Sequence, residues 1–549
     1  MPQVSTIFLK KMRIGIDLDN TLIDYTEAFV FGAKEMGLIP EKWNGRKAKI
    51  REFIRNRPEG EQSWEALQGK VYGRWIGKAQ LYPGSFRFLW RCSLKGWFPI
   101  VVSHKTKFGH YDPEQIPLRE AAMNFLKLEE IWKTNESDLL GEIYFESSRA
   151  EKLQTIENLG LDVFIDDLPE VLEDPNFPNS VRSVLFDPYH QHASTNLEKK
   201  FSWEGLSNLL LGEWEEYEII ALAEYCKISE VKSLKAVRGG GNSRIYCVNS
   251  ADQSYSLKLY PEDPKHDRVR SEFDGINLIF RSGIKSVPEP IGVKPKLNVA
   301  SFKWIEGQPI ENPLEEDIQD CVEFLKNLQK LKGKTEFNNF PHASAACFSG
   351  EKIESQLNTR LDQLRQVDND ELNYYLDEHL EKVMIQMLAR AHDIWPDQGF
   401  ANPLDRKFQI LSPSDFGFHN ILKCKEGKLV FYDFEYFGWD DPVKLICDFA
   451  FHPGMELNQK LRQHWYRLML NFLGEDLTPR LNASWPLYGL CWVMILLNEF
   501  RGKIWERRRV ANAVERTSRK KILTRQLHRS QKMLKHIDES VRTQTFDFQ

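Results

Sequence analysis

The chain lacks the cysteine patterns that mark metal clusters and disulfide frameworks. Its 549 residues include 8 Cys, and none of them forms a Cys-x-x-Cys pair or lies beside a group of histidines. A zinc cluster needs such pairs at short spacing, and small secreted domains are dense in paired cysteines. We therefore expect reduced thiols and a reducing compartment.

Long hydrophobic segments and a strong excess of one charge are also missing. The longest apolar run, Leu487–Leu497 with Gly489 inside it, is well short of the roughly 20 residues that span a bilayer. The apolar run Val4–Leu9 is too short for a secretion signal. A formal net charge of −5 is small for this length and gives no general affinity for membranes or nucleic acid. We expect a cytoplasmic protein without a membrane partner.

No repeat, low-complexity segment or Gly-x-x-x-x-Gly-Lys-Ser/Thr loop is present. Residues 501–535 hold 13 Lys and Arg against 2 acidic residues, which could bind an anionic partner or nucleic acid. The segment lacks a series of interleaved aromatic residues on which bases could stack. We interpret it as the solvated face of a terminal helix.

The first two hundred residues alternate short, apolar, β-branched runs with helical patterns. The predicted strands are Arg13–Asp17, Phe98–Ser103, Glu142–Glu146, Val163–Asp167 and Val181–Asp187. Helical patterns such as Leu118–Leu126 and Arg149–Leu159 lie between them. This alternation predicts an α/β fold with a doubly wound parallel sheet, in which ligands bind at the carboxyl ends of the strands. Residues 24–80 interrupt it with helical sequence and are predicted to lie above the first strand as a lid.

Two carboxylates follow the first strand, in Ile14-Gly-Ile-Asp17-Leu-Asp19-Asn-Thr21. A carboxylate can attack phosphorus and form an aspartyl-phosphate, which splits hydrolysis into two easier displacements. A second carboxyl group can protonate the leaving oxygen and then activate water. Acids this close repel one another, so a Mg²⁺ ion and a lysine are expected to balance their charge.

Further polar residues follow at later strand ends. Ser103 ends the second predicted strand, Lys152 precedes the fourth, and Asp166 and Asp167 end the fourth. Together with the Asp-x-Asp-x-Thr sequence, these pieces resemble the haloacid-dehalogenase-like phosphatase superfamily over residues 12–212.

The resemblance implies that Asp17 is the nucleophile and Asp19 the general acid/base. It implies phosphate binding by Thr21, Ser103 and Lys152, and Mg²⁺ binding by Asp17, Asp166 and Asp167. Residues 24–80 correspond to the cap of that superfamily. Arg149 and Lys105 are alternatives to Lys152, and His104 is a candidate only by its position beside Ser103.

The pattern changes after a predicted linker at residues 213–227. Predicted elements are antiparallel strands in Lys235–Val248 and at Tyr255–Tyr260, a helix at Arg268–Ser282 and a strand at Val299–Ile305. From Gln308 onward the sequence is mostly helical, apart from Gln409–Phe437.

This second region holds the groups that phosphoryl transfer from a nucleotide needs. The turn Gly239-Gly240-Gly241-Asn242 could bring backbone amides close to phosphate oxygens, although a plain glycine-rich hairpin is the alternative. Lys258 lies inside an apolar strand, where a lysine is costly unless it is paired or bound to a ligand, and Glu272 is the expected partner. An acid and an amide stand five residues apart at Asp415 and Asn420, before an apolar strand that ends at Asp433.

The arrangement resembles the aminoglycoside phosphotransferase and choline kinase family over residues 228–520, within a domain of residues 228–540. The resemblance implies a two-lobed, kinase-like α+β domain with a largely helical C-terminal lobe. The implied nucleotide contacts are Gly239, Gly240, Gly241, Asn242, Lys258 and Glu272, with the adenine-binding hinge at Phe302–Gly307. Trp304 in the hinge could contact the nucleotide or serve in packing.

The implied catalytic base is Asp415, and the implied Mg²⁺ ligands are Asn420 and Asp433. Glu435 could bind the metal or pair with a basic residue. The chain departs from the family's usual His-Gly-Asp or Asn-Asp sequence, because Pro413-Ser414-Asp415 stands there. The acid–amide spacing is kept.

These observations predict a bifunctional enzyme, in which a Mg²⁺-dependent small-molecule phosphatase is fused to a kinase that uses ATP or another nucleoside triphosphate on a hydroxyl group. Substrates of sugar or amino-alcohol type are expected. Two alternatives stay open: one domain could be an inactive sensor of a phosphorylated ligand or nucleotide, or the chain could process nucleic-acid ends. The net charge and the missing Gly-x-x-x-x-Gly-Lys-Ser/Thr loop speak against the latter.

Overall fold

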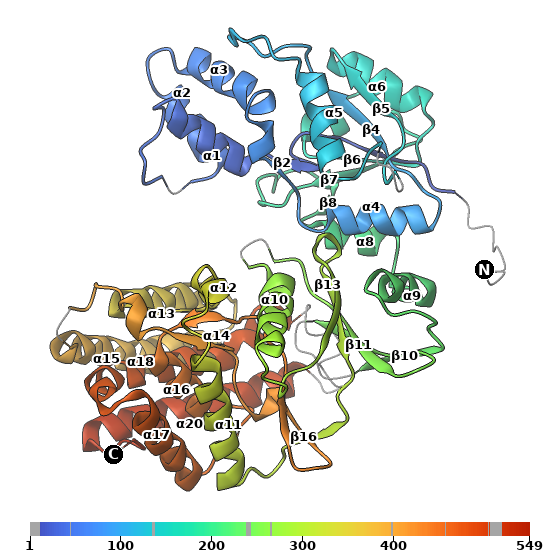
Figure 1. Ribbon diagram of the computed structural model, residues 1–549. Coiled ribbons are helices and arrows are strands. Elements are labelled where there is room, and N and C mark those ends of the chain that lie inside the picture. Colours follow the sequence, from blue (N-terminus) through green and yellow to red (C-terminus); the bar gives the residue numbers. More distant parts are fainter. Residues whose placement is uncertain are drawn as a thin grey trace. The chain divides into compact units, whose positions relative to one another are not determined.

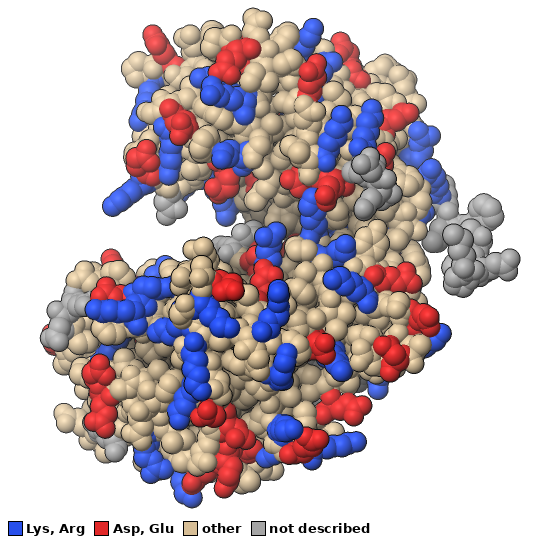
Figure 2. All heavy atoms as spheres, in the orientation of Figure 1, with Lys and Arg blue, Asp and Glu red and all other residues tan. Residues whose placement is uncertain are grey.

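The computed structural model describes residues 11–43, 45–133, 138–237, 243–263, 266–396, 399–455, 457–502, 504–505 and 519–548. The chain divides into two compact units, Met1–Ile219 and Ile220–Gln549 (Figure 1). Basic and acidic side chains are interspersed over the visible face of each unit (Figure 2), in line with the small net charge. No helix in the described ranges is both long and apolar enough to cross a membrane.

The first unit is built on a six-stranded parallel sheet with the order β5-β4-β1-β6-β7-β8. The strands are β1 (Ile14–Ile16), β4 (Ile100–His104), β5 (Ile143–Glu146), β6 (Val163–Asp166), β7 (Arg182–Phe186) and β8 (Glu198–Lys200). The predicted strands are confirmed, whereas β8 was not predicted because this short edge strand is charged rather than apolar. The chain leaves β1 toward β4 on one side and returns to β6 on the other. This reversal makes the end of β1 the place where ligands of such sheets bind.

Helices cover both faces of this sheet, as the doubly wound pattern predicts. They are α4 (Ser85–Leu94), α5 (Leu118–Leu128), α6 (Arg149–Asn158), α7 (Pro169–Leu172) and α8 (Trp203–Leu210), and α9 (Glu216–Tyr225) follows them. Gly15 lets a neighbouring side chain approach the buried strand β1 closely, because a Cβ added there would lie 2.6 Å from the Phe164 ring.

A group of helices lies beside the sheet of the first unit (Figure 1). It consists of α1 (Thr26–Glu35), α2 (Lys47–Arg55) and α3 (Gly60–Tyr72). A two-residue antiparallel ladder between β2 (Ile23–Asp24) and β3 (Gln80–Leu81) closes the excursion at its base. The group has an aromatic core, in which Phe29 stacks on Trp64 with 5.1 Å between ring centroids. It is therefore a small helical subdomain inserted after the first strand.

The second unit begins with a five-stranded antiparallel sheet of order β12-β13-β11-β10-β9. Its strands are β9 (Ser233–Val237), β10 (Arg244–Asn249), β11 (Ser254–Leu259), β12 (Pro290–Lys294) and β13 (Val299–Lys303), with helix α10 (Arg268–Arg281) between β11 and β12. The turn predicted at Gly239–Asn242 lies outside the described residues.

The remainder of the second unit is mainly helical. Its helices are α11 (Glu315–Gln329), α12 (Thr335–Asn338), α13 (Gly350–Arg365), α14 (Asp370–Tyr375), α15 (Glu381–Ile394), α16 (Pro442–Phe451), α17 (Gln459–Leu473), α18 (Thr478–Leu496) and α20 (Arg519–Thr543). Two small sheets, β14 (Gly307–Pro309) with β16 (Ile421–Cys424) and β17 (Leu429–Phe431), and β15 (Ile410–Ser412) with β18 (Gly438–Asp440), interrupt them. The predicted fold class, an α/β unit followed by an α+β unit with a helical C-terminal region, is confirmed. Within the basic segment 501–535, residues 503 and 506–518 lie outside the described parts.

Candidate active sites

The end of β1 brings three predicted site residues of the first unit together. Asp17 follows β1, and its backbone N–H donates to Ile165 O at 2.8 Å, which continues the pairing with β6. Asp166 ends β6, so both carboxylates lie at the same edge of the sheet. The Lys152 ammonium, on α6, donates to Asp17 Oδ1 and to Asp166 Oδ2, both at 2.7 Å. The Lys152 side chain is only 2% exposed, so this lysine belongs to the cluster and is not solvated.

Three carboxylates form a compact acidic cluster around this lysine. The candidate ligand oxygens of Asp17, Asp166 and Asp167 lie within 4.8 Å of one another. Burial, together with Asp166 and Asp19, outweighs the attraction of Lys152 and raises the pKa of Asp17 to about 7. Burial and the neighbouring acids also raise the pKa of Asp167 well above its ordinary value. Negative charge thus exceeds what one lysine balances, and this oxygen set fits Mg²⁺.

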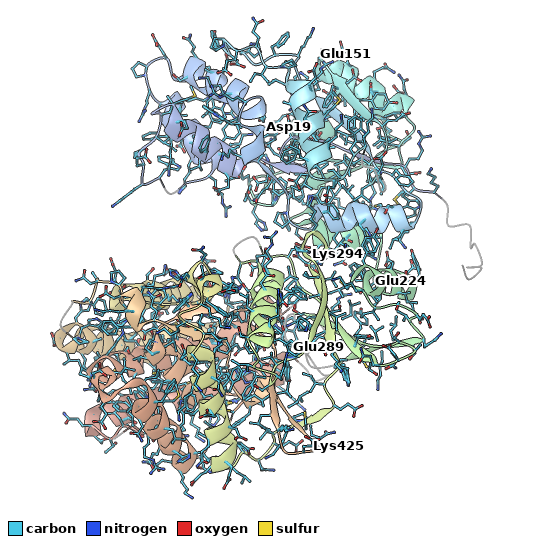
Figure 3. All side chains as sticks on the ribbon, in the orientation of Figure 1. Asp19, Glu151, Glu224, Glu289, Lys294 and Lys425 are labelled. Atoms are coloured by element: carbon cyan, nitrogen blue, oxygen red, sulfur yellow. The ribbon has the colours of Figure 1, made fainter. Side chains whose placement is uncertain are left out.

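Asp19 has its own cation, which sequence reasoning had offered only as an alternative to Lys152. The Lys105 ammonium donates to Asp19 Oδ2 at 2.6 Å and to Oδ1 at 2.9 Å, and the Tyr25 hydroxyl donates to Oδ1 at 2.8 Å. Lys105 lies two residues beyond the strand-end Ser103, and Tyr25 immediately precedes α1. In Figure 3, Asp19 lies on the side of the sheet where the helices α1–α3 gather.

The two hydroxyl residues predicted to bind phosphate differ in their surroundings. The Thr21 hydroxyl donates to Asp167 Oδ1 at 3.4 Å. Ser103, at the end of β4, is buried, and its hydroxyl has no hydrogen-bond partner in the described part of the chain. Buried hydroxyls are rarely left unbonded, so this one fits a ligand oxygen. His104 is exposed and turned toward the Ser147 carbonyl at 3.1 Å, and Arg149 is exposed.

A cavity of about 550 Å³ adjoins this site and is lined by the loop after β1 and by α2. Asn20 and Asp167 line it, and Lys47, Arg51 and Arg55 contribute basic side chains from α2. Successive members of this set are four positions apart, so all three residues share one helix face. The Lys47 ammonium donates to Asn20 Oδ1 at 2.9 Å, which links α2 to the loop after β1.

In the second unit, Lys258 of β11 forms the centre of a similar cluster. Its ammonium donates to Glu272 Oε2 of α10 at 2.6 Å and to Asp433 Oδ1 at 2.5 Å. Glu435 Oε2 is 3.7 Å away. The Tyr260 hydroxyl also donates to Glu272, at 2.7 Å. The cluster contains the expected Lys258–Glu272 pair and adds Asp433, from a distant part of the chain, as a second partner of Lys258.

The acids of this cluster are not equivalent. Burial, with Glu435 and Glu272 nearby, raises the pKa of Asp433 to about 7 despite Lys258. Burial acts on Glu435 too, but Lys258 and Arg268 outweigh it and hold its pKa below the ordinary value. Arg268 donates to Glu435 Oε1 at 2.8 Å and the Ser243 hydroxyl to Oε2 at 3.0 Å. Oxygens of Glu272, Asp433 and Glu435 lie within 4.8 Å of one another, a set that also fits a divalent cation, with Asp433 its least compensated member.

Asp415 lies in the loop between β15 and β16 and outside this acidic cluster. The Asn420 amide donates to the Asp415 carbonyl at 2.9 Å and closes the loop. The preceding residue, Ser414, has a φ of +68°, in the left-handed region. Burial alone would raise the pKa of Asp415, but the hydrogen bond and charge of His419 with the nearby His452 outweigh burial and lower it. Asp415 is therefore held as a carboxylate.

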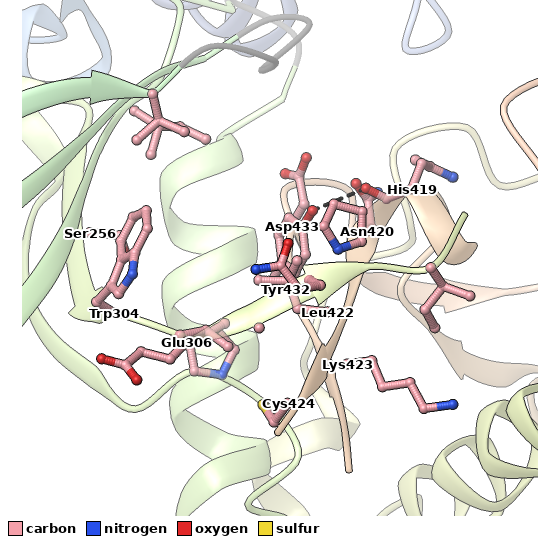
Figure 4. A pocket seen from close by; sticks show the side chains of 18 of the residues that line it. Ser256, Trp304, Glu306, His419, Asn420, Leu422, Lys423, Cys424, Tyr432 and Asp433 are labelled. Carbon is pink, nitrogen blue, oxygen red and sulfur yellow. Dashed lines mark hydrogen bonds between the residues drawn. The ribbon is translucent and has the colours of Figure 1, made fainter. Parts of the chain in front are cut away.

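A cavity of about 1450 Å³ joins Lys258, Asp415, Asn420 and Asp433. The predicted hinge lines it as well, and Trp304 lies across the pocket from Asp433 and Asn420 (Figure 4). Residues Gly239, Gly240, Gly241 and Asn242, predicted to cover the nucleotide phosphates, lie outside the described residues.

Sequence reasoning missed some residues that the structure places at these sites. Tyr25 binds Asp19, and His419 and His452 contact Asp415 or its surroundings. His419 stands inside the interval from Asp415 to Asn420, so its position alone could have suggested it. His452 gives no such signal, because it follows a helix that is distant from that loop in the sequence.

One comparison with known protein families falls within the second unit. Residues 233–480 match the sequence model of the phosphotransferase enzyme family. The second unit therefore carries a domain of that family.

A putative nucleotidase of Oceanobacillus iheyensis is 27% identical over 187 residues, which are 33% of this chain and 90% of the relative. This relative is consistent with a phosphatase-like N-terminal domain. Among solved structures, a spectinomycin phosphotransferase bound to ADP and spectinomycin is 13% identical, with a TM-score of 0.43, and the match covers 59% of this chain and 99% of that chain. For a choline kinase of Streptococcus pneumoniae the identity is 12%, the TM-score 0.40, and the coverage 59% of this chain and 100% of that chain.

Proposed function

We propose that the chain is a bifunctional phosphoryl-transfer enzyme, with a phosphatase formed by residues 12–212 and an ATP-dependent kinase formed by residues 228–540. The observation that carries this proposal is the same in both units: a buried lysine holds carboxylates from distant parts of the chain beside a cavity. Lys152 does so for Asp17 and Asp166, and Lys258 for Glu272 and Asp433. Such clusters are expensive to bury without a ligand that completes them.

In the phosphatase, an Asp17 oxygen attacks the phosphorus of a phosphomonoester, and the bond from phosphorus to the leaving oxygen breaks. Asp19 supplies a proton to that oxygen, and the product alcohol leaves an aspartyl-phosphate. Asp19, now a carboxylate, takes a proton from water as the water attacks phosphorus and releases Asp17. The Lys105 ammonium and the Tyr25 hydroxyl, both bonded to Asp19, hold its carboxyl group in place for these proton transfers.

The transferred phosphoryl group carries negative charge that the site must balance. Asp17, Asp166 and Asp167 would hold Mg²⁺, which neutralises charge on the phosphoryl oxygens when bound. Lys152 keeps its proton, because its paired acids raise its pKa despite burial, so it can bind a phosphate oxygen. The unpartnered Ser103 hydroxyl and Thr21 supply further contacts.

The phosphatase substrate is proposed to be a small anionic phosphomonoester, with nucleotides as the first class to test. The relative named as a putative nucleotidase supports this class. The basic face of α2, with Lys47 and Arg51 beside the cavity, fits an anionic compound larger than its phosphate.

In the kinase, Asp415 accepts the proton of the acceptor hydroxyl as that oxygen bonds to the γ-phosphorus and the bond to the β-phosphate oxygen breaks. Lys258, positioned by Glu272, would bind the nucleotide phosphates. Asn420 and Asp433 would hold Mg²⁺, which neutralises phosphate charge when bound. Glu435 is engaged by Arg268 and Ser243, so we assign it to positioning and, at most, to a shared metal contact.

The remaining contacts and the cellular setting follow from the same proposal. The backbone of Gly239–Asn242 is proposed to cover the phosphates, and Trp304 to border the adenine. The acceptor is proposed to be a small molecule with a hydroxyl group, of sugar or amino-alcohol type. A cytoplasmic location suits a kinase that uses ATP.

Two parallel screens test the proposal. The first measures release of inorganic phosphate from a panel of nucleoside monophosphates and sugar phosphates, with Mg²⁺ and with EDTA. The second measures ADP formation from ATP with choline, amino-alcohols, aminoglycosides and sugars as acceptors. We expect activity in both, lost in EDTA. Tight binding of a phosphorylated compound without turnover in one screen would instead favour a sensor role for that unit.

A further inference from the structure

Two stacked imidazole rings lie against the carboxylate of Asp415. His419 contacts Asp415 Oδ1 through its Nε2 at 3.1 Å. The ring of His452 stacks on that of His419, with 3.9 Å between centroids and 8° between planes. The Nε2 of His452 lies 3.8 Å from the same carboxylate oxygen, beyond a direct hydrogen bond. His452 therefore meets Asp415 chiefly through the ring of His419.

The outer ring is fixed by contacts of its own. The Gly454 N–H donates to His452 Nδ1 at 3.1 Å. The indole of Trp492 meets the His452 ring edge-on at 4.7 Å, and Trp492 is itself tied down by donating to Asp448 Oδ1 at 2.9 Å. His452 thus follows α16 in a defined orientation, held from two sides.

The inner ring is equally constrained. A Cβ added at Gly417 would lie 2.8 Å from His419 Cε1 and 2.9 Å from Nδ1. Gly417 therefore gives the ring the space that any larger residue would occupy. With His452 stacked on it and Gly417 close to Cε1 and Nδ1, the imidazole of His419 has little freedom to rotate, and its Nε2 stays directed at Asp415.

The hydrogen-bond directions also decide between two uses of this cluster. One oxygen or nitrogen from each of Asp415, His419 and His452 lies within 4.8 Å of the others, a grouping that could suggest a metal. However, His452 Nδ1 accepts the Gly454 N–H, so the proton of a neutral ring lies on Nε2, facing Asp415. A metal ligand needs a free electron pair on that nitrogen. His452 therefore presents an N–H to Asp415 rather than a metal-binding electron pair, and the direct hydrogen bond to the carboxylate comes from His419.

We propose that His419 and His452 are positioning residues for Asp415: His419 fixes the rotation of the carboxylate through its hydrogen bond, and His452 acts through His419 by holding its ring. The inference rests on the proposed role of Asp415 as the base that accepts the acceptor's proton. A base must meet the hydroxyl at hydrogen-bond distance with its oxygen correctly directed. Pro413 and Ser414 precede Asp415 in the loop. The ring pair supports the Asp415 side chain from residues that follow it in the sequence.

A double-mutant cycle tests the proposal. The measured rate is that of ADP formation from Mg²⁺·ATP, with water as the phosphoryl acceptor. His419→Leu removes the donor and should lower kcat about 10- to 100-fold with little change in the KM for ATP. His419→Gln keeps an amide donor and should recover much of that loss. His452→Ala should lower kcat less than His419→Leu, and His452→Phe, which keeps a flat ring, should lower it least.

The decisive variant combines His419→Leu with His452→Ala. If His452 acts through His419, the second change adds nothing to the first. Additive losses, or a loss in KM alone, would overturn the proposal. Crystal structures add a readout that needs no turnover: in His452→Ala the bond from His419 Nε2 to Asp415 should lengthen or break, and an unchanged bond contradicts the proposal.

Controls separate this inference from the proposed kinase activity. Asp415→Asn should abolish ADP formation, and if it does not, the assignment of Asp415 fails rather than the role of the ring pair. If Asp415→Asn is inactive while His419→Leu is fully active, the positioning role fails. His528→Leu changes an exposed histidine of α20 in the same way and should have no effect. Urea unfolding of each variant shows whether a lower rate comes from an unfolded fraction.

Discussion

The two units place their reactive carboxylates differently around the same kind of cluster. In the first unit, the proposed nucleophile Asp17 belongs to the acidic cluster and is bonded to its lysine. In the second unit, the proposed base Asp415 lies outside the cluster around Lys258 and is bonded to His419 instead. The pKa values follow this difference, since that of Asp17 is raised to about 7 and that of Asp415 is lowered.

This difference has a chemical meaning. A carboxylate that becomes phosphorylated must lie where the phosphoryl group is held, which is where cations gather. A carboxylate that only accepts a proton from the acceptor lies on the far side of the phosphoryl group and needs orientation more than charge balance. On the proposed roles, the first unit builds its cluster around the nucleophile, whereas the second builds its cluster around the nucleotide phosphates and leaves the base apart.

The largest effect is expected from removing the lysine of the first cluster. Lys152→Met should lower phosphate release about 10³-fold, because the nucleophile and the phosphate lose their shared cation. It should also destabilise the first unit by roughly 3 kcal/mol or more, because buried carboxylates lose their partner. Initial rates and urea unfolding measure both. Lys127→Met, on the exposed face of α5, is the control, and equal rates for the two variants would refute the role of Lys152.

A smaller loss is expected from the corresponding change in the second unit. Lys258→Met should lower kcat/KM for ATP about 10²-fold, while phosphate release by the first unit stays unchanged. The base is untouched in this variant, so some turnover should persist. Lys294→Met changes an exposed lysine at the end of strand β12 that does not line the cavity, and it should leave ADP formation unaltered. Loss of both activities in Lys258→Met would show that the units do not act independently.

The raised pKa of Asp17 predicts a pH-dependent stability without metal. Its folded pKa of about 7 is above its ordinary value of 3.8, so the protonated form favours folding. That contribution is present below about pH 4 and is lost as the pH rises through about 7. In EDTA, wild type should lose on the order of 2 kcal/mol relative to Asp17→Asn between pH 5.5 and pH 8.

Metal should remove this difference, because Mg²⁺ stabilises the charged cluster. Denaturant unfolding of the two proteins at both pH values, in EDTA and in Mg²⁺, measures it. A difference between wild type and Asp17→Asn that does not vary with pH would contradict the raised pKa.

The smallest expected effect concerns substrate choice in the first unit. Arg51→Gln removes one cation from the cavity face of α2 and should raise KM for an anionic phosphomonoester about 3- to 10-fold, with kcat nearly unchanged, as for an exposed charge pair. Lys49→Gln removes an equal charge from a part of α2 that does not line the cavity. If both variants raise KM equally, the effect is one of general charge and the cavity does not hold the substrate.

Much of the fold can be predicted from the sequence. The strands around Asp17, Ser103 and Asp166 are short, apolar and followed by polar residues, so both their pairing and their meeting point follow from parallel-sheet geometry. The antiparallel strands around Lys258 are equally clear. Strand β8 was missed because its sequence, Glu198-Lys-Lys, lacks the apolar pattern, and its place is set by pairing with β7.

A site residue can be predicted from the sequence where burying that residue type in its local context would cost free energy without a partner. Lys258 in an apolar strand required a partner, and the structure supplies Glu272 and Asp433. Lys152 gave a weaker signal, because a lysine on a helix is usually solvated and only the tertiary fold turns it inward. The pairing of Asp19 with Lys105 and the stacking of His452 on His419 depend on side-chain packing between elements, which periodicity does not encode.

The most direct test of two independent active sites is a reciprocal measurement on one preparation of each variant. Asp17→Asn should abolish phosphate release from phosphomonoesters and leave ADP formation at the wild-type rate. Asp415→Asn should do the reverse. Loss of both activities in either variant, or persistence of an activity in the variant that lacks its proposed reactive carboxylate, would contradict the account.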